Sequence, residues 1–579
     1  KNDLLLDESD IIEGLQIFCD RFHKCKNVED FIELINKDYL NSPRKQLILK
    51  LHQKITYLNF IKNIKSNLHL VSHKPRSGKS ITLLYISKYL LEKGKHRILI
   101  MTSVPATIKS FIEDLEKFID FKNIQYKNQD EFKSVNKSFK GIVFCSVQYL
   151  KTDSTNIEEK KKYLKDINFD VMIIDECHLG SSTKKTEKEI LNVNDVSTIN
   201  DIKNLIKMII FASGTSDKTK YFYNIKNVYE WEMEDEGFMK ELTTDETPDE
   251  DKNKLLKIMD ARHGEYFKEC YNDITLNKDY SKCPIQVLMK KSFPKSIEKE
   301  IEKYNTKHNT EYGYSWSSLL ALNKVEKKVK VNGKTKTVIE YENKFELENS
   351  SDGIDLLIAC FENIISNDRM NKNTIMKSIE TTQSNYKSRI SKKSDPKLFL
   401  MYLPTHTGNN NIKQLQETII RFIKDNKLWS NYNIEYSNAT TDSSDSKLEY
   451  NKYIKNIINK SKKDEKTGCI LLLGNKGGVG ITYHNCDATI SLDDGHNLDN
   501  QKQRYSRALT EADGKTIGIN VDMNIQRTYL YINVILHKYK KITKTRMTNG
   551  EILKYLYEHN IFLFNPDEIK NGKISTHEI

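Results

Sequence analysis

The sequence lacks the features of several protein classes. No apolar run approaches the roughly 20 residues of a membrane-spanning helix, and no signal-peptide pattern opens the chain. The nine cysteines are an odd number without paired spacing, which argues against a disulfide framework and favours a reducing compartment. No internal repeat with a period of about 20–50 residues is present. We therefore expect a soluble intracellular protein without membrane contact, and these patterns do not predict its oligomeric state.

What the chain does have is length and a surplus of positive charge. Its 579 residues exceed what one hydrophobic core usually serves and predict roughly three or four domains. Charged residues make up 30% and aromatic residues 9%, which indicates a polar but folded protein. The formal net charge of +12 suits a polyanionic partner such as nucleic acid, but a solvated lysine-rich surface explains it equally well.

Two blocks of the chain show the pattern of α/β proteins. Short apolar runs rich in β-branched residues alternate with helical stretches in both blocks. Such runs predict strands of a parallel sheet that helices cover on both faces. In the first block they are 97–101, 141–145, 171–174 and 208–212, and in the second they are 397–403, 469–473, 488–492 and 516–521. The sequence therefore predicts an α/β fold with two lobes, each built on a parallel sheet.

The other segments are assigned from composition. The predicted organisation is a small helical N-terminal segment at 1–45, a first lobe at 46–245, a charged inserted or bridging region at 246–395, a second lobe at 396–545 and a tail at 546–579. The bridging region contains only a weak strand, at 285–288. A strand-separating wedge, a docking arm for protein partners and a spacer are all open roles for it. Its aromatic residues Tyr304, Tyr312, Tyr314 and Trp316 fit a packed cluster better than a base-stacking surface.

A phosphate-binding loop is predicted where a strand near residue 70 runs into a helix. Such a loop needs backbone N–H groups that face phosphate, a lysine that neutralises the β and γ oxygens, and a hydroxyl on Mg²⁺. Gly78, Lys79 and Ser80 supply these groups, and the loop before them contains Pro75, Arg76 and Ser77. The Walker A pattern G-x-x-x-x-G-K-S asks for glycine where this chain has His73. A chance triplet before a surface helix is the alternative.

Two acidic residues follow a predicted strand further along the first lobe. Asp175 and Glu176 come directly after the apolar run 171–174. In a nucleotide hydrolase, an aspartate at this place holds Mg²⁺ and a glutamate orients or deprotonates the attacking water. We therefore predict Ser80 and Asp175 as metal ligands and Glu176 as the catalytic carboxylate. An exposed acidic strand end is the alternative.

A basic helix is predicted in the second lobe. Gln503 and Arg507 are four residues apart and would share one face of it, with Arg504 beside them. An arginine delivered onto the γ-phosphate stabilises the charge that develops during phosphoryl transfer. Arg507 is the preferred candidate for this role and Arg504 is the reserve, whereas a solvated basic helix is the alternative.

The order of these motifs resembles that of superfamily 2 helicases and translocases. Motif I is matched by 78–80, motif Ia by 102–105, motif II of the DExH type by 175–178, motif III by 213–215, motif V by 478–481 with Asp487, and motif VI by 503–507. The resemblance covers roughly 50–240 and 396–530. It implies two RecA-like lobes with ATP between them and nucleic acid across both.

The resemblance also implies roles for individual residues. Gln53 is similar to the glutamine that reads adenine, and Gly480 to a nucleotide contact of motif V. The residues that would couple nucleotide to nucleic acid are His178, Ser213, Gly214 and Thr215. Thr510 stands where the second arginine of motif VI is usual, which leaves the identity of the arginine finger open.

Two finer resemblances concern the second block. The glycine-rich stretch 477–482 and the spacing from Asn497 to Gln503 are more similar to chromatin remodellers than to DEAD-box proteins. The stretch 507–527 resembles helicase-like ATPases of large cytoplasmic DNA viruses. A viral protein of this kind would act in the cytoplasm, a viral factory or the virion.

These observations together predict an ATP- and Mg²⁺-dependent helicase or translocase. Its contacts with DNA or RNA would be largely independent of sequence. Three alternatives stay open. They are a translocase on duplex DNA that never unwinds it, a kinase or AAA-type phosphate-loop protein, and a non-catalytic binding module with degenerate sites. The motifs of the second lobe argue against the kinase, and His73 and Thr510 motivate the binding module.

Overall fold

The structure, a computed structural model, divides into two compact units, 1–281 and 282–579. The described residues are 44–146 (except 76, 103, 104 and 137), 166–175, 206–214, 224–331 (except 245, 246, 274, 275, 277–279 and 281), 334–343, 351–389 (except 369–372), 396–404, 409–437, 447–474 and 485–564 (except 496), with 16, 23, 220 and 483. The helical segment predicted at 1–45 therefore lies almost entirely outside the described residues.

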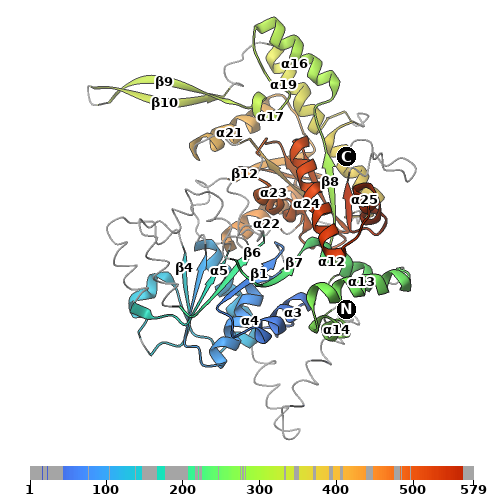
Figure 1. The fold of residues 1–579 in the computed structure, drawn as a ribbon. Coiled ribbons are helices and arrows are strands. Elements are labelled where there is room, and N and C mark those ends of the chain that lie inside the picture. Colours follow the sequence, from blue (N-terminus) through green and yellow to red (C-terminus); the bar gives the residue numbers. More distant parts are fainter. Residues whose placement is uncertain are drawn as a thin grey trace, which may run out of the picture. The chain divides into compact units, whose positions relative to one another are not determined.

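Unit 1 is built on a seven-stranded sheet in which neighbouring strands are parallel (Figure 1). The strands are β1 (Leu68–His73), β2 (Arg97–Thr102), β3 (Tyr126–Lys127), β4 (Gly141–Ser146), β5 (Val171–Ile174), β6 (Met208–Ser213) and β7 (Asn227–Trp231). They lie in the order β3-β4-β2-β5-β6-β1-β7. The four apolar runs predicted as strands are β2, β4, β5 and β6, so these predictions are confirmed.

Both faces of this sheet are buried, which explains the uninterrupted apolar runs. Along β2, Ile98 and Ile100 belong to one core cluster and Leu99 to the other, because successive strand residues face opposite sides. Helices cover the first face with residues such as Leu83 and Phe111. The helices of unit 1 are α3 (Leu51–Lys62), α4 (Lys79–Glu92), α5 (Pro105–Lys117), α12 (Met233–Thr243), α13 (Asp249–His263) and α14 (Tyr266–Tyr271), with 3₁₀ turns at Ile119–Phe121 and Gln129–Ser134.

Unit 2 contains a second seven-stranded parallel sheet. Its strands are β8 (Ile285–Lys290), β11 (Lys397–Tyr402), β12 (Tyr432–Ser437), β13 (Gly468–Leu473), β14 (Cys486–Ser491), β15 (Ile517–Asp522) and β16 (Phe562–Phe564), in the order β12-β13-β11-β14-β15-β8-β16. The predicted fold class, two RecA-like lobes that each contain a parallel sheet, is thereby confirmed.

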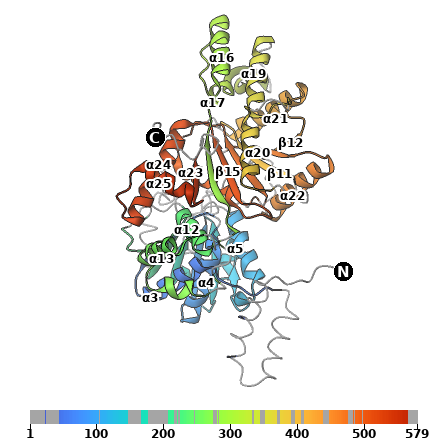
Figure 2. The same ribbon diagram turned by 90° about the vertical axis from the view of Figure 1, so that its right-hand side faces the viewer.

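Helices lie on both sides of the second sheet. Figure 2 shows α20 and α21 on one side of it and α24 on the other. The helices of unit 2 are α16 (Lys295–His308), α17 (Trp316–Leu319), α19 (Ser351–Ile364), α20 (Ile375–Asn385), α21 (Asn409–Asp425), α22 (Lys447–Lys463), α23 (Leu498–Tyr505), α24 (Ile525–Thr543) and α25 (Asn549–Glu558), with a 3₁₀ turn at Ser506–Leu509. Among the described helices of the whole chain, none is long and apolar enough to cross a membrane.

The two sheets share one topology. When the strands of each sheet are numbered from one to seven along the chain, both sheets have the order 3-4-2-5-6-1-7. β8 is therefore the counterpart of β1, and β14 is the counterpart of β5. As a result, each loop at the carboxyl edge of the first sheet has a topological equivalent in the second sheet.

The boundaries of the lobes differ from the predicted ones because strand pairing recruits distant segments. β8 lies within the predicted bridging region 246–395, yet it pairs with β15 and β16 inside the second sheet. α13 and α14, from the same region, belong to unit 1. β16 lies within the predicted tail 546–579 and forms the edge of the second sheet. The bridging region is thus divided between the units, and 291–396 is the first crossover connection of the second sheet.

That crossover carries an isolated antiparallel ribbon, β9 (Leu322–Val331) and β10 (Lys334–Asn343). Neither strand was predicted. The aromatic residues that precede the ribbon are packed: Tyr304, Tyr312 and Trp316 are buried in the core of unit 2, whereas Tyr314 is exposed and donates a hydrogen bond to Glu302. The structure therefore favours the packed cluster over the base-stacking surface.

Candidate nucleotide-binding site

The predicted phosphate loop lies at the carboxyl end of β1, where ligands of open parallel sheets usually bind. β1 ends at His73 and α4 begins at Lys79. Gly78 precedes the helix with φ +80°, a left-handed conformation that glycine adopts most easily. A Cβ at this position would lie 2.6 Å from Nε2 of Gln53. Glycine is therefore required at position 78 both by backbone conformation and by space.

Lys79 and Asp175 meet at this edge of the sheet. Lys79 Nζ lies 3.4 Å from Asp175 Oδ1, and the two side chains are 10% and 3% exposed. Asp175 follows β5, and its N–H donates to the carbonyl of Met101 in β2. Ser80 is the second residue of α4. The structure thus brings together three of the residues that the sequence singled out, from segments about 95 positions apart.

Side chains of α3 form hydrogen bonds with the backbone of the loop. Gln53 Nε2 donates to the carbonyl of Gly78 at 3.0 Å, and Gln53 Oε1 accepts from the N–H of Lys50. His52 Nε2 lies 2.8 Å from the carbonyl of Ser77. Both polar groups of Gln53 therefore contact backbone, and its predicted contact with adenine stays a prediction.

The opposite end of the loop is fixed by β7 and α12. The Lys74 N–H donates to the carbonyl of Trp231 at 2.7 Å, and Lys74 Nζ forms a 2.6 Å ion pair with Glu236. Asp235, next to Glu236, accepts from Arg262 and from His263. Burial alone would raise the pKa of Asp235, but the Arg262 guanidinium and the hydrogen bond with His263 outweigh it and lower the pKa. No sequence pattern pointed to this support.

His73 occupies the position where the Walker A pattern has glycine. Its ring is fully buried, and its Nε2 lies 2.8 Å from Thr56 Oγ1. Burial lowers the pKa of His73 to about 3, and Lys79 adds to the effect. The side chain is therefore a neutral packing group behind the loop. Because His73 is the last residue of β1, the loop itself comprises only Lys74–Gly78.

The end of β6 packs against the same loop. A Cβ on Gly214 would lie 2.9 Å from Cγ of Pro75. Ser213, the last residue of β6, is buried. The residues of the predicted coupling motif that the structure describes therefore adjoin the loop. The other predicted residues, Arg76, Glu176, His178, Thr215 and Gly480, lie outside the described residues.

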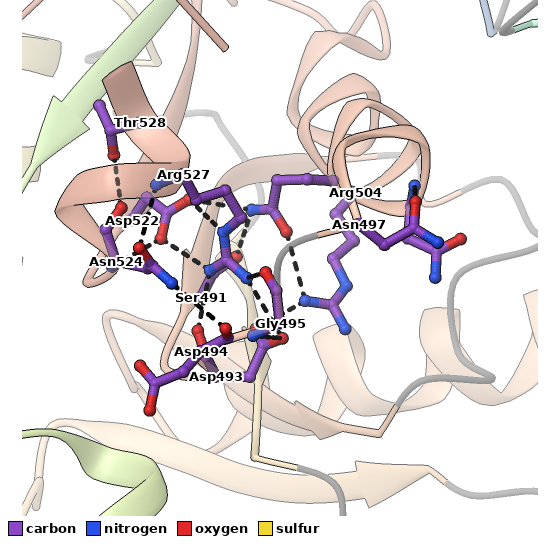
Figure 3. Close-up of polar contacts among 12 residues, drawn as sticks. Ser491, Asp493, Asp494, Gly495, Asn497, Arg504, Asp522, Asn524, Arg527 and Thr528 are labelled. Carbon is purple, nitrogen blue, oxygen red and sulfur yellow. Dashed lines mark hydrogen bonds and ion pairs between the residues drawn. The ribbon is translucent and has the colours of Figure 1, made fainter. Parts of the chain in front are cut away.

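In unit 2, the loop after β14 is the counterpart of the loop after β5 and contacts Arg504 of α23 (Figure 3). Arg504 Nη1 donates to Asp493 Oδ1 at 2.6 Å and lies 3.3 Å from Gln501 Oε1. Its guanidinium also lies over the ring of Tyr402, 4.6 Å from the centroid. A carboxylate, an amide and an aromatic face therefore fix this arginine within its own unit.

Arg527 links the loops after β14 and β15 (Figure 3). Its Nε and Nη2 donate to the two carboxylate oxygens of Asp522 at 2.8 and 2.7 Å. Its Nη1 donates to the Gly495 carbonyl at 2.7 Å and lies 3.3 Å from Asp493 Oδ2. Only 1% of the Arg527 side chain is exposed. Arg527 therefore positions Asp493, the carboxylate that accepts the hydrogen bond from Arg504. This arginine was not among the predicted site residues.

The helix predicted to carry Gln503, Arg504 and Arg507 is shorter than expected. α23 ends at Tyr505, and Arg507 lies in the 3₁₀ turn that follows, with its guanidinium 5.8 Å from the Tyr483 ring centroid. Gln503 and Arg507 therefore do not share one α-helical face. The predicted motif V residue Asp487 is buried near the start of β14 and accepts from the N–H of Leu398.

The residues at the edge of the first sheet fit a magnesium–nucleotide complex. Gly78 directly precedes α4, and backbone N–H groups at the N-terminus of a helix attract phosphate. Lys79 is placed beside the Asp175 carboxylate, and the Ser80 hydroxyl follows at the next position. Hydroxyl and carboxylate oxygens are ligands that Mg²⁺ accepts, with phosphate oxygens and water in the remaining positions.

Comparison with known proteins agrees with this arrangement over part of the chain. Residues 40–208 match the family model "Type III restriction enzyme, res subunit". For this part of the chain, the match confirms the predicted resemblance to superfamily 2 helicase-like ATPases. The DExH subtype and the viral branch stay predictions.

A curated relative and two solved structures are also similar to the chain. The "Putative type II restriction enzyme and methyltransferase RM.MpnORF110P C-terminus" of Mycoplasma pneumoniae is 29% identical over 186 residues, which are 29% of this chain and 24% of that protein. The ATP-dependent Type ISP restriction-modification enzyme LlaBIII bound to DNA gives a TM-score of 0.47 at 12% identity, over 83% of this chain and 28% of that one. S. cerevisiae Dbp5 bound to RNA and ADP BeF3 gives 0.41 at 10% identity, over 91% and 96%. The chain thus spans about a quarter of the length of the first two.

Proposed function

We propose that the chain is an ATP- and Mg²⁺-dependent motor, a helicase or translocase that moves along nucleic acid. The observation that carries the proposal is the 3.4 Å approach of Lys79 Nζ to Asp175 Oδ1 beside a left-handed Gly78. This arrangement lies at the carboxyl edge of a parallel sheet, where phosphate groups bind. The family match over residues 40–208 supports it.

The proposed roles in unit 1 follow from the chemistry of each group. The loop amides and Lys79 bind the phosphates, and Ser80 and Asp175 hold Mg²⁺. Bound ATP with its metal ion supplies the phosphoryl group that water accepts. Glu176 orients that water, and Gln53 keeps the loop in shape through its hydrogen bond to Gly78. Phosphate would replace Asp175 as the main partner of Lys79.

Unit 2 contributes an arginine in this proposal. Arg507 is the preferred arginine finger and Arg504 is the reserve, with Gln503 beside them. The contacts of Arg504 support this ranking, because its charge is already balanced by Asp493 at 2.6 Å. His178, Ser213, Gly214 and Thr215 couple the nucleotide site to the nucleic acid, and Gly480 contacts nucleotide. Closing of the lobes on ATP and their release on hydrolysis would advance the chain.

The proposed partner is DNA or RNA, contacted through phosphates and largely without regard to sequence. Protein partners that dock through the segments of 246–395, and an intracellular location, belong to the same proposal. The glycine-rich stretch 477–482, with its similarity to chromatin remodellers, favours a second candidate. This is a translocase on duplex DNA, acting in restriction, transcription or remodelling without unwinding.

Steady-state ATP hydrolysis tests the proposal directly. The rate is measured without nucleic acid and then with single-stranded DNA, duplex DNA and RNA in turn. Stimulation by one polymer, lost in Lys79→Ala and in Glu176→Gln while nucleic-acid binding persists, is the expected result. Wild-type turnover in either variant would refute the assignment.

Two displacement assays separate the two candidate functions. A helicase displaces one strand of a partial duplex, whereas a pure duplex translocase displaces only the third strand of a triplex. Triplex displacement without strand displacement would establish the second candidate.

A further inference from the structure

The ribbon β9–β10 is the part of unit 2 to which the proposed function assigns no role. Both strands are ten residues long and pair over their whole length, from Leu322 with Asn343 to Val331 with Lys334. Within the described residues, neither strand pairs with the seven-stranded sheet. Figure 1 shows the ribbon extending away from that sheet. A two-stranded ribbon is only marginally stable in water by itself, so a partner that covers it would stabilise it.

Positive charge is concentrated in the half of the ribbon that ends with the pair Val331 and Lys334. Residues 327–336 contain five lysines and no acidic residue, and these lysines are Lys327, Lys328, Lys330, Lys334 and Lys336. The three acidic residues of the two strands, at 326, 340 and 342, all lie in the other half. The ribbon therefore has a basic half, which ends with the pair Val331 and Lys334, and a mixed half, which ends with the pair Leu322 and Asn343.

Strand pairing does not neutralise this charge. In the register, Lys328 and Lys330 are opposite Thr337 and Thr335. The other three lysines of the basic half are opposite valines, as Lys327 with Val338, Lys334 with Val331 and Lys336 with Val329. Oppositely charged residues at such positions stabilise a ribbon, yet this half contains none. An anion that neutralises these lysines would therefore come from outside this half of the ribbon.

The register also distributes the lysines over both faces. Residues paired across antiparallel strands share a face, and the next pair lies on the other face. The pairs with valine and the pairs with threonine are therefore on opposite faces, with three lysines on one and two on the other. A flat anionic surface would meet one face only. A groove with phosphates along both walls would meet both.

We propose that β9–β10 is an arm that enters the major groove of duplex DNA and contacts the phosphates of both walls through the five lysines named above. This proposal rests on the proposed function for the choice of nucleic acid as the anion. The major groove of B-form DNA admits a two-stranded β-ribbon, whereas the major groove of A-form RNA is too deep and narrow for side chains to read. The partner is therefore duplex DNA, and the competing partner is an acidic protein.

Binding of the full chain to a labelled DNA duplex, followed by fluorescence anisotropy without nucleotide, tests the arm. The test variant replaces the five lysines of 327–336 by glutamine. We expect about tenfold weaker binding or more, and a flatter plot of log Kd against log salt, because each lost phosphate contact lowers the slope by about 0.9. A variant with five arginines at the same positions keeps the charge and should bind as the wild type does.

A matched variant controls for the loss of net charge. It replaces five exposed lysines elsewhere in unit 2, Lys424, Lys427, Lys462, Lys463 and Lys554, by glutamine. The arm is overturned if the two glutamine variants bind duplex DNA equally well. It is also overturned if the test variant loses as much affinity for duplex RNA as for duplex DNA. Circular dichroism of all variants confirms that each is folded.

The outcomes distinguish the arm from the proposed function. Unchanged duplex binding in the test variant, with wild-type ATP hydrolysis that DNA still stimulates, rejects the arm and keeps the motor. Weaker duplex binding in the test variant, with no ATP hydrolysis by the wild type, keeps the arm and rejects the motor.

Discussion

At the scale of single residues, Gly78 shows how two constraints meet at one position. Its φ of +80° is unfavourable for any residue with a Cβ, and that Cβ would overlap the Gln53 amide. We predict that Gly78→Ala costs about 1–2 kcal/mol through the left-handed backbone alone. Displacement of Gln53 should weaken nucleotide binding further. Titration with a fluorescent ATP analogue measures the effect.

Gly94 provides the matched control for this substitution. It has a similar φ of +86°, but no atom lies within 4 Å of a Cβ built there. Gly94→Ala should therefore lose comparable stability in thermal unfolding while it binds nucleotide as the wild type does. Equal nucleotide affinity in the two variants would show that the Gln53 contact has no effect on the loop.

Arg527 is the second residue for which the structure predicts a large effect. Its removal leaves Asp522 and part of the charge of Asp493 uncompensated in a buried place. Breaking such a buried pair costs about 3–5 kcal/mol, so Arg527→Met should strongly destabilise unit 2 in urea unfolding. Exposed Arg421 offers the control: Arg421→Met should change the free energy of unfolding little. Equal midpoints for the two variants would contradict the prediction.

His73 predicts how stability responds to pH. Burial lowers its pKa to about 3 from the ordinary value of 6.5, so between these values the unfolded chain binds a proton that the folded chain does not. The contribution of the buried, neutral His73 to the free energy of unfolding is therefore complete above pH 6.5 and is lost as the pH falls toward 3. Burial lowers the pKa of His52 as well, which adds in the same direction.

Urea unfolding at a series of pH values between about 4 and 7 checks this behaviour. The wild type should become less stable as the pH falls, and His73→Gln should show a smaller slope. Identical slopes would mean that His73 titrates alike in the folded and unfolded chain.

At the scale of elements, the ends of β1 and β6 are coupled through Pro75 and Gly214. Since a Cβ on Gly214 would lie 2.9 Å from Pro75, a larger side chain must move the phosphate loop. We predict that Gly214→Val costs about 1–3 kcal/mol, as overpacking usually does, and that most of this cost appears as weaker nucleotide binding. Calorimetric titration with ADP measures it, and an unchanged affinity would contradict the coupling.

The elements that the sequence predicted are those with both faces buried. β2, β4, β5 and β13 are largely apolar runs in the interior of their sheets, and β14 and β15 are also interior and fully buried although they contain polar residues. β7 and β12 were not predicted, because each is an edge strand of its sheet, is only partly buried and contains polar residues. β16 has three residues, which is too short for any periodicity. Burial on two faces is therefore what made a strand visible in the sequence.

The same distinction applies to the candidate site. Lys79 and Asp175 were predictable because strand–loop motifs fix their place at a sheet edge. Trp231, Glu236 and Arg527 were not, since their roles depend on contacts between segments that no local pattern connects. Gly78 could be assigned from its motif, whereas its hydrogen bond with Gln53 required the structure.

At the scale of the whole molecule, the charge of +12 and the proposed phosphate contacts predict a strong dependence on salt. If about six phosphates are contacted, affinity for duplex DNA should fall roughly a thousandfold between about 50 and 200 mM salt. Anisotropy titrations across this range measure the slope. A flat plot would exclude binding through phosphates and favour a role without nucleic acid.

The shared strand order of the two sheets has a consequence for how the chain is made. In unit 1 the last strand, β7, ends at Trp231, so its sheet is complete before the first strand of unit 2 is synthesised. β8 ends at Lys290 but must wait for β15, which begins at Ile517. At about 5–20 residues per second, the 227 residues from 290 to 517 take roughly 10–45 s to emerge.

During that interval β8 has neither of its neighbours, because β16 is synthesised later still. β8 is mostly apolar and almost fully buried in the finished sheet, so the nascent chain presents an unpaired, mostly apolar strand after the described strands of unit 1 have been synthesised. Such strands are the usual starting points of aggregation. Synthesis of the segment between β8 and β15, and not folding of unit 1, is thus the stage at which this chain is most prone to aggregate.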